Sequence, residues 1–268
     1  MRLAVNARMY SVSPSAKADW KALMAWVVRR AGLDWLSLDH DSPAPLETLW
    51  ARKDLGMVMM CGLPYALSQP QPRLIAAPIP SPARYGGRPV YFSDFVVLAD
   101  APCTTLEDTF GGVLGYTLPG SMSGGIAPYH HLMELGRTRG HRLYTGVVGD
   151  LINGRGVIDA VVSGRADVGT LDSYYLDLLR QHEPAYAAQV RVVDSTRAHP
   201  IPPLVATAAL SEAQTSQLRG ALIDTATEPA LAPLMQRLML KGFSVVESHD
   251  YDHLADMARA QTEPFDRL

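Results

Sequence analysis

Residues 113–136 read VLGYTLPGSMSGGIAPYHHLMELG, and the whole chain is best interpreted outward from this stretch. It begins as an apolar segment typical of a strand that ends near Leu118, and it continues from Ile126 to Leu135 with the spacing of a helix. The turn between them, from Pro119 to Gly125, holds two serines and three glycines. A plain strand-to-helix turn needs one glycine and one capping residue. The additional serine and the two additional glycines therefore indicate a further role for this turn.

The composition of this turn suits an anion. The first N–H groups of a helix lack intrahelical partners and carry a positive partial charge. Ser121 and Ser123 would add hydroxyl donors, and Gly124 and Gly125 would let an oxyanion come close. The alternative is an N-cap with a tight turn that binds nothing. Residues 121–125 lack the first glycine of a nucleophile elbow, and they match neither a Walker A nor a Rossmann glycine pattern.

Length and composition exclude several classes of protein. The 268 residues are 47% hydrophobic, which suits one large domain or two lobes with a sizeable core. Only 19% are charged and the net charge is −3, so no broad basic field is available for nucleic acid. No run of about 18 apolar residues predicts a membrane span. We expect a monomer that neither inserts into membranes nor binds nucleic acid.

Histidines and cysteines raise the question of a metal or a nucleophile. His130, His131, Glu134 and His141 lie close in sequence, but HExxH is absent and the spacing does not place two imidazoles on one helix face. A polar helix face is the favoured interpretation. The two cysteines have neither metal nor CxxC spacing. The sequence therefore predicts no metal, no cofactor and no catalytic residue.

Apolar runs alternate with helix-period segments along the chain, which predicts an α/β fold with mostly parallel sheets. Expected strands cover 3–7, 56–62, 73–80, 90–100, 113–119, 142–148, 166–172, 190–196, 202–210 and 243–247. Expected helices cover 14–31, a short piece near 46–50, 126–135, 156–164, 174–182, 211–225 and 231–240, with a last one from Tyr251. Ser13-Pro14 marks the first helix start, and Ser211 with Gln214 forms a capping-box pattern.

Three stretches occur in the order seen in one family. They are LPGSMSGGIAPYHHL at 118–132, VVSGRADVGTLDSYYLDLL at 161–179 and IPPLVATAALSEAQTSQLRGALID at 201–224. With MVMMCGLPYAL and VYFSDFVVLAD upstream, the chain resembles the phosphate/phosphite/phosphonate-binding proteins of ABC transporters over about residues 2–245. The Ser-x-Ser-Gly turn and the Gly-x-Ala-Asp-x-Gly strand entry are specific in combination and weak singly.

The resemblance implies a two-lobed type 2 periplasmic-binding-protein fold, in which each lobe is a mostly parallel sheet flanked by helices and two crossing strands join the lobes. Lobe one would comprise residues 1–92 and 203–268, and lobe two residues 93–202. A small anionic ligand would bind in the cleft, and the lobes would close on it by a hinge motion. An ABC transporter permease is the implied protein partner.

Carried over residue by residue, the resemblance implies a set of ligand-binding positions. Met122 would act through its backbone, and Asp172 occupies an acidic position that can meet a ligand's amine. The implied set is Tyr10, Tyr65, Tyr91, Ser93, Ser121, Met122, Ser123, Gly124, Arg155 and Asp172.

One departure from the family leaves the ligand open. Where the family often has a Ser-His-type pair, this chain has Asn153-Gly154-Arg155. Arg155 could compensate, because a guanidinium grips oxyanions bidentately, or it could be a solvated residue at a helix start. The ligand is then a phosphonate, phosphate, carboxylate, sulfonate or larger organic anion.

Two alternatives concern location and class. The resemblance implies a periplasmic protein, whereas MRLAVNARMY is not a signal peptide as written, so a cytoplasmic role is the alternative. The alternative function is an enzyme on the same fold, as in thiamin or menaquinone biosynthesis. Its candidate catalytic residues would be Cys61, His130, His131 and Asp172. The effector lobe of a transcription regulator ranks last, because the chain opens on a strand.

Overall fold

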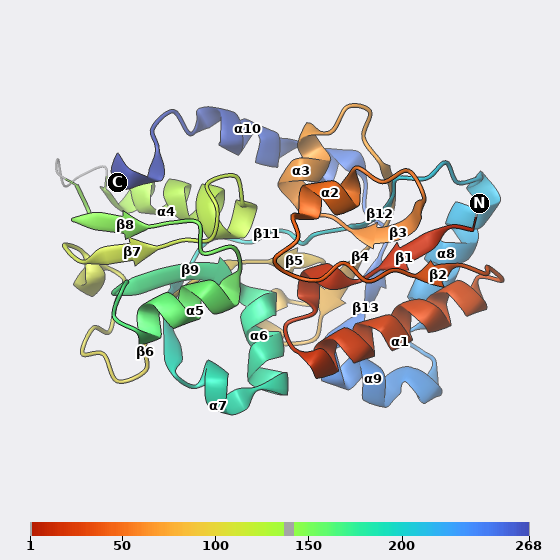
Figure 1. The fold of residues 1–268 in the computed structure, drawn as a ribbon, viewed down its shortest axis with the longest axis horizontal. Helices are drawn as coiled ribbons and strands as arrows, with labels where there is room; N and C mark the ends of the chain where they lie inside the picture. The colour runs from red at the N-terminus through yellow and green to blue at the C-terminus, as the bar shows by residue number, and fades with distance from the viewer. Residues whose placement is uncertain (1, 137–141, 268) are drawn as a thin grey trace. The chain divides into compact units, whose positions relative to one another are not determined.

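The computed structural model describes residues 2–136 and 142–267, and by its packing the chain divides into two units. Unit 1 comprises residues 1–90 and 200–252, and unit 2 comprises residues 91–199 and 253–268. Each unit has its own α/β sheet (Figure 1). The chain passes between the units near residues 90, 199 and 252, the first two within paired strands β5 (Val90–Tyr91) and β11 (His199–Pro200).

Unit 1 is built on a six-stranded sheet of order β13-β4-β12-β3-β1-β2. Its strands are β1 (Ala4–Asn6), β2 (Leu36–Ser37), β3 (Leu55–Met59), β4 (Arg73–Pro80), β12 (Leu204–Ala206) and β13 (Leu240–Ser244). Its helices are α1 (Pro14–Arg30), α2 (Leu46–Trp50), α3 (Gly62–Leu67), α8 (Glu212–Asp224) and α9 (Ala232–Arg237). The short η turns are η1 (Arg8–Tyr10), η2 (Ala83–Tyr85), η5 (Pro229–Leu231) and η6 (Ser248–Tyr251). Helices α1 and α9 cover one face of this sheet, and α2 and α3 lie on the other (Figure 1).

Unit 2 is built on a five-stranded sheet of order β10-β6-β9-β7-β8. Its strands are β6 (Ser93–Leu98), β7 (Val113–Gly115), β8 (Gly146–Val148), β9 (Val168–Asp172) and β10 (Val190–Ser195). Its helices are α4 (Ala127–Gly136), α5 (Gly154–Val162), α6 (Ser173–His182), α7 (Pro184–Ala187) and α10 (Asp252–Ala260). The turns are η3 (Glu107–Thr109), the π-helical η4 (Met122–Ile126) and η7 (Phe265–Arg267).

Local signals for helix ends are confirmed. The Ser13 hydroxyl accepts a hydrogen bond from Ala16 N, and Pro14 is the first residue of α1. The predicted apolar face of α1 is buried, with Trp20, Leu23 and Val27 fully covered. At the start of α8, Ser211 and Gln214 form the predicted capping box.

The sheets are mixed, because strands that run the other way are inserted in both. In unit 1, β12 pairs antiparallel with both β3 and β4, while β1 is parallel to β2 and β3. In unit 2, β6 is antiparallel to β9 and β10, while β7 is parallel to β8 and β9. The last strand also differs in place: the sequence predicted 243–247, but β13 begins at Leu240, where it pairs with Pro80 of β4.

Residues 253–268 pack with unit 2, whereas the sequence predicted them in lobe one. The reason is an aromatic contact that no local pattern shows. Phe265 is buried in the core cluster of unit 2 beside Phe95 and Leu132, and its ring stacks on Tyr116 with centroids 4.6 Å apart. The C-terminal segment therefore completes the core of unit 2.

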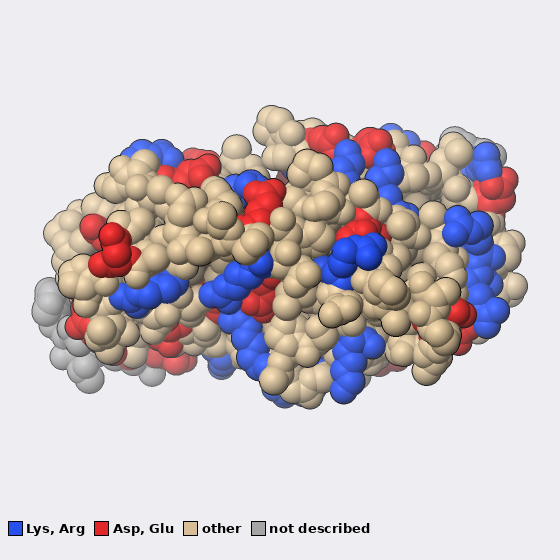
Figure 2. All heavy atoms as spheres, turned by 90° about the horizontal axis from the view of Figure 1, so that it is seen from below, with Lys and Arg blue, Asp and Glu red and all other residues tan. Residues whose placement is uncertain are grey.

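The charged side chains are mixed in sign. Figure 2 shows lysine and arginine interspersed with aspartate and glutamate on the face in view, in line with the small net charge of the chain. Several are paired at the surface, such as Arg237 with Asp19 at 2.8 Å and Arg30 with Asp224 at 2.9 Å. Among the helices described, none has the length and hydrophobicity needed to cross a bilayer.

Candidate functional site

The three parallel strands of unit 2 bring separate loops to one edge of its sheet. Strands β7, β8 and β9 run in the same direction, so the segments that follow them leave from the same edge. These segments are the turn 116–121, the loop 149–153 and the residue Asp172. The first two are in contact, because a Cβ at Gly149 would lie 2.4 Å from the Tyr116 hydroxyl.

The serine-glycine turn forms the entrance of the helix η4–α4. Ser121 is the N-cap, and its Oγ accepts a hydrogen bond from Gly124 N at 3.2 Å. The N–H groups of Gly125 and Ile126 bond to Ser121 O at 2.9 and 3.0 Å. The N–H groups of Met122 and Ser123 are those for which helix geometry offers no internal acceptor. Two backbone donors and the hydroxyl groups of Ser121 and Ser123 are thus available at the positive end of the helix.

The glycines have a structural reason that the sequence did not reveal. A Cβ at Gly124 would lie 1.7 Å from Thr117 Oγ1, and a Cβ at Gly125 would lie 2.6 Å from Pro119 O. The segment that enters the turn therefore runs directly against the first helical residues. The interpretation that Gly124 and Gly125 leave room for a ligand is not needed to explain them. Gly120, by contrast, has no atom within 4 Å of its ideal Cβ among the described residues.

We expect Gly124→Ala to destabilise the protein, because the added methyl group cannot be accommodated without moving Thr117. Overpacking of this kind costs about 1–3 kcal/mol of unfolding free energy, measurable by urea denaturation. Gly120→Ala is the matched control, since the same methyl group meets open space there. Equal stability of the two variants would show that Thr117 does not hold the turn in this position.

Two threonines beside the turn were missed in the sequence. Thr170 on β9 is fully buried, and its Oγ1 donates to Gly124 O at 3.0 Å, which ties the helix entrance to the strand. Thr117 is 7% exposed, and no acceptor or donor among the described residues contacts its buried Oγ1. A buried hydroxyl without a partner is costly, which makes Thr117 a further candidate group at the helix entrance. No signal in the sequence singled it out, because Thr117 lies inside the strand predicted for residues 113–119.

Asn153 and Arg155 lie at the start of α5 in unit 2. Asn153 is the N-cap, and its side-chain oxygen accepts from Arg155 N and Gly156 N at 3.0 and 3.2 Å. The preceding Ile152 is 52% exposed and has φ of 66°, a left-handed conformation that is rare for a β-branched residue. Such strain clusters at ligand sites, and here it lies in a loop that leaves the same sheet edge as the serine turn.

The guanidinium of Arg155 is engaged within unit 2. Its Nη2 lies 2.6 Å from Glu183 Oε1, and its Cζ lies 4.7 Å from the centroid of the Tyr186 ring. Tyr186 in turn donates its hydroxyl proton to Asp159 Oδ1 at 2.8 Å. Burial raises the pKa of Tyr175 next to this pair to about 12. Arg155 would have to exchange Glu183 for a ligand, and its role there stays a prediction.

Asp172 caps a helix. Its Oδ1 accepts from Tyr174 N at 2.8 Å and from Tyr175 N at 3.0 Å at the start of α6. A carboxylate at this position stabilises the N-terminus of the helix. The predicted contact with a ligand amine is not tested by this geometry.

The predicted tyrosines and Ser93 are buried in their own units. In unit 1, Tyr10 stacks on Trp20 with centroids 6.5 Å apart, and Tyr65 meets the Tyr251 ring edge-on at 5.2 Å. Burial raises the pKa of the Tyr65 hydroxyl. In unit 2, Tyr91 and Ser93 are 3% and 1% exposed, and Ser93 N donates to Thr196 Oγ1. Their assignment to the ligand stays a prediction.

Two of the histidines and Cys61 contact protein groups rather than a cluster of potential metal ligands. His131 Nε2 lies 2.7 Å from Asp194 Oδ2, and His130 Nε2 lies 2.7 Å from Met257 O. Cys61 Sγ lies 3.9 Å from Met9 Sδ. Within residues 2–136 and 142–267, no group of three or more potential ligands could hold a metal ion. His141, the last of the predicted cluster, lies outside the described residues.

Comparison with known proteins gives the family. A family model described as "ABC transporter, phosphonate, periplasmic substrate-binding protein" matches residues 10–251, nearly the whole chain. The protein belongs to this family of substrate-binding proteins. The prediction of a solute-binding protein is thereby confirmed, since the family consists of transporter binding proteins rather than enzymes. No protein in a curated collection matches the sequence.

Solved structures share the fold at low identity. A binding protein component of an ABC phosphonate transporter from Pseudomonas aeruginosa (PA3383) is 16% identical, with a TM-score of 0.77 over 95% of this chain and 84% of that one. PhnD1 from Prochlorococcus marinus, solved with methylphosphonate, is 17% identical, with a TM-score of 0.76 over 96% and 97%. XAC2383 from Xanthomonas citri, solved with ATP, is 20% identical, with a TM-score of 0.63 over 97% and 99%. The predicted two-lobed α/β fold is confirmed.

Proposed function

We propose that this protein captures a small oxyanion-bearing ligand, such as a phosphonate, phosphate or related organic anion, at the serine turn of unit 2. The observation that carries the proposal is the helix entrance at Ser121–Ser123. Two N–H groups without helical acceptors and two partly exposed hydroxyl groups meet there. Donors fixed at a helix N-terminus bind anions without further reorganisation. The unpartnered hydroxyl of Thr117 supports the same site.

The residues near the serine turn favour an organic anion over inorganic phosphate. Ile152 presents an exposed apolar side chain in the loop that shares the sheet edge with the turn. Asp172, at the end of the neighbouring strand β9, supplies a carboxylate that would attract a ligand amine. An organic anion with a short carbon chain or an amine fits this combination better than inorganic phosphate. Tyr10, Tyr65, Tyr91 and Ser93 remain predicted from the resemblance.

We further propose that the protein works in the periplasm and delivers its ligand to an ABC transporter permease. The support for both is the family, whose members are described as periplasmic substrate-binding components. A pull-down with the ligand-loaded protein as bait, followed by mass spectrometry of the membrane proteins recovered, would test the partnership. Failure to recover any permease with ligand-loaded protein would argue against it.

The ligand proposal is tested by thermal unfolding with a panel of anions. The panel contains phosphate, phosphite, methylphosphonate, aminoethylphosphonate, an alkylsulfonate and a short carboxylate, with sodium chloride at matched ionic strength as the control. A ligand that binds only the native state at about 100 times its Kd stabilises by about 2.7 kcal/mol. We therefore expect at least one phosphonate to raise Tm by about 5–10 °C. An unchanged Tm across the panel would contradict the proposal.

A further inference from the structure

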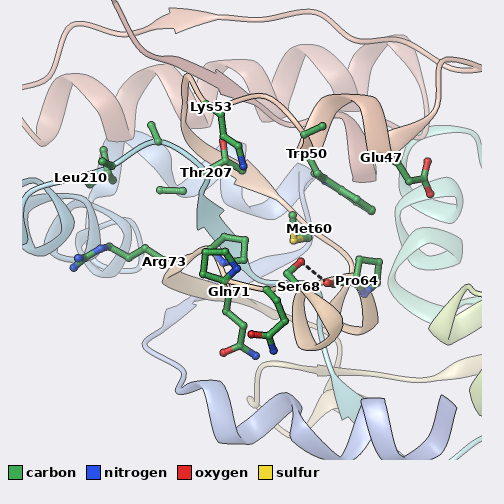
Figure 3. A pocket seen from close by; sticks show the side chains of 17 residues that line it. Glu47, Trp50, Lys53, Met60, Pro64, Ser68, Gln71, Arg73, Thr207 and Leu210 are labelled. Atoms are coloured by element: carbon green, nitrogen blue, oxygen red, sulfur yellow. Dashed lines mark hydrogen bonds between the residues drawn. The ribbon is translucent and has the colours of Figure 1, made fainter. Parts of the chain in front are cut away.

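Unit 1 contains a pocket that is separate from the serine turn. Its volume is about 830 Å³, within the range typical of small-molecule sites. Every lining residue belongs to unit 1, from the segments 47–53, 60–64, 68–73 and 206–210. The pocket thus lies beside α2 and α3 and the ends of β3, β4 and β12 (Figure 3).

The walls of the pocket combine apolar and polar side chains, and the apolar part is held in place. Trp50, Met60, Pro64, Pro70 and Pro72 contribute to them. The Trp50 indole N–H donates to Met59 O at 3.1 Å, which fixes the ring plane. Prolines keep few backbone conformations, so this surface loses little entropy when a ligand binds. Such walls suit the ring or chain of an organic molecule.

One end of the pocket is positive. Lys53 and Thr207 both line the pocket, and in the view of Figure 3 they appear at one end, whereas the carboxylate of Glu47 appears at the other. Lys53 is exposed and makes no ion pair among the described residues, whereas Arg73 pairs with Glu212. The Oγ1 of Thr207 is covered and has no hydrogen-bond partner in the described part of the chain. An ammonium group and an unused hydroxyl that line the same pocket are favourable partners for an anionic head group.

We propose that this pocket is a second binding site, for a small amphipathic organic anion whose head group binds Lys53 and Thr207 and whose apolar body lies against Met60 and the proline walls. The orientation follows from charge, since Glu47 would repel an anionic head at the opposite end. Lys53 is exposed, so its ammonium group can meet an anionic head group that enters the pocket from solvent. This site is independent of the oxyanion site in unit 2, so two different ligands can bind one chain.

Anilinonaphthalenesulfonate, an aromatic sulfonate that fluoresces when it binds apolar surfaces, is the probe. The native protein is titrated in saturating inorganic phosphate and methylphosphonate, which would fill the oxyanion site proposed at Ser121–Ser123. We expect one probe per chain. Lys53→Met keeps the aliphatic chain but removes the charge, and it is expected to weaken probe binding at least about tenfold. Lys241→Met, at another exposed lysine of unit 1, should leave binding unchanged.

A pocket-filling variant and a hydrogen-exchange experiment test independently whether the probe binds in this pocket. Ala209→Trp fills the pocket from an exposed position and should abolish probe binding without changing Tm. Hydrogen exchange should show slower exchange at residues 68–73 and 206–210 when the probe is bound. The Ser121→Ala/Ser123→Ala variant should still bind the probe, which separates this site from the proposed oxyanion site. Full probe binding in both pocket variants, or loss of the probe only in the serine variant, would overturn the inference.

Discussion

Replacing Ser121 and Ser123 together with alanine is expected to weaken binding of the best oxyanion ligand by at least about 100-fold. Each hydrogen bond to a charged group contributes about 1.5–3 kcal/mol, so two lost hydroxyl donors account for that factor. The backbone N–H groups of Met122 and Ser123 remain in the variant. Isothermal titration calorimetry with the ligand identified by thermal unfolding measures the change.

The controls separate binding from stability. Ser121 is also the N-cap of η4, so its loss costs about 1 kcal/mol of unfolding free energy on its own. Ser211→Ala removes the corresponding cap of α8 in unit 1 and should leave affinity unchanged. Ser121→Asp keeps a good N-cap but brings a negative charge to the site, and it should abolish anion binding in a stable protein. Unchanged affinity in the double variant would mean that the turn serves only to start the helix.

The free energy of unfolding is expected to fall by up to about 3 kcal/mol as pH decreases from about 6.5 to 4, because of His199. His199 is 3% exposed, and no partner among the described residues bonds its Nδ1. Its ring stacks on the His253 ring with centroids 5.8 Å apart. Burial lowers the pKa of His199 to about 4, and the nearby charges of Arg197, His253 and His130 act in the same direction.

The sign follows from proton binding. In the unfolded chain, His199 has its ordinary pKa of about 6.5, so between pH 6.5 and 4 the unfolded state holds the proton and the native state does not. The stabilisation is complete above pH 6.5 and is lost as pH falls toward 4. Urea denaturation at several pH values measures this slope. His199→Gln should flatten it, whereas His249→Gln, at a histidine whose side chain is 76% exposed, should not. A steep slope that persists in His199→Gln would assign it to other groups.

Local sequence signals predicted much of the fold, because they act over a few residues. Ser13-Pro14 and the Ser211–Gln214 pair mark helix starts through hydrogen bonds that are made within one turn. Gly164, with φ of 72°, follows α5 as predicted, since a left-handed residue ends a helix at low cost. The position of strand β13 was predicted wrongly, because it depends on pairing with β4, which is far away in sequence.

The candidate site was predicted only in part. The serine turn could be predicted because the capping residue and the hydrogen-bond donors are neighbours in the sequence. Arg155 was predicted to face a ligand, but its ion pair with Glu183 depends on how α5 and α7 pack. Thr117 and Thr170 were missed, since nothing in their neighbourhood indicates that they contact the helix entrance at Gly124.

By itself, the sequence determined that a helix follows the serine-glycine turn with hydroxyl donors near its positive end, because capping is a local interaction. It predicted Ile126 as the first helical residue, whereas the structure begins the helix at Met122. Only the tertiary structure decided why Gly124 and Gly125 are glycines, since the atoms that exclude a Cβ there belong to residues 117–119 of the incoming segment. It also decided that residues 253–268 complete unit 2, through the stacking of Phe265 on Tyr116. Close packing between segments depends on three-dimensional distances, which periodicity and composition do not encode.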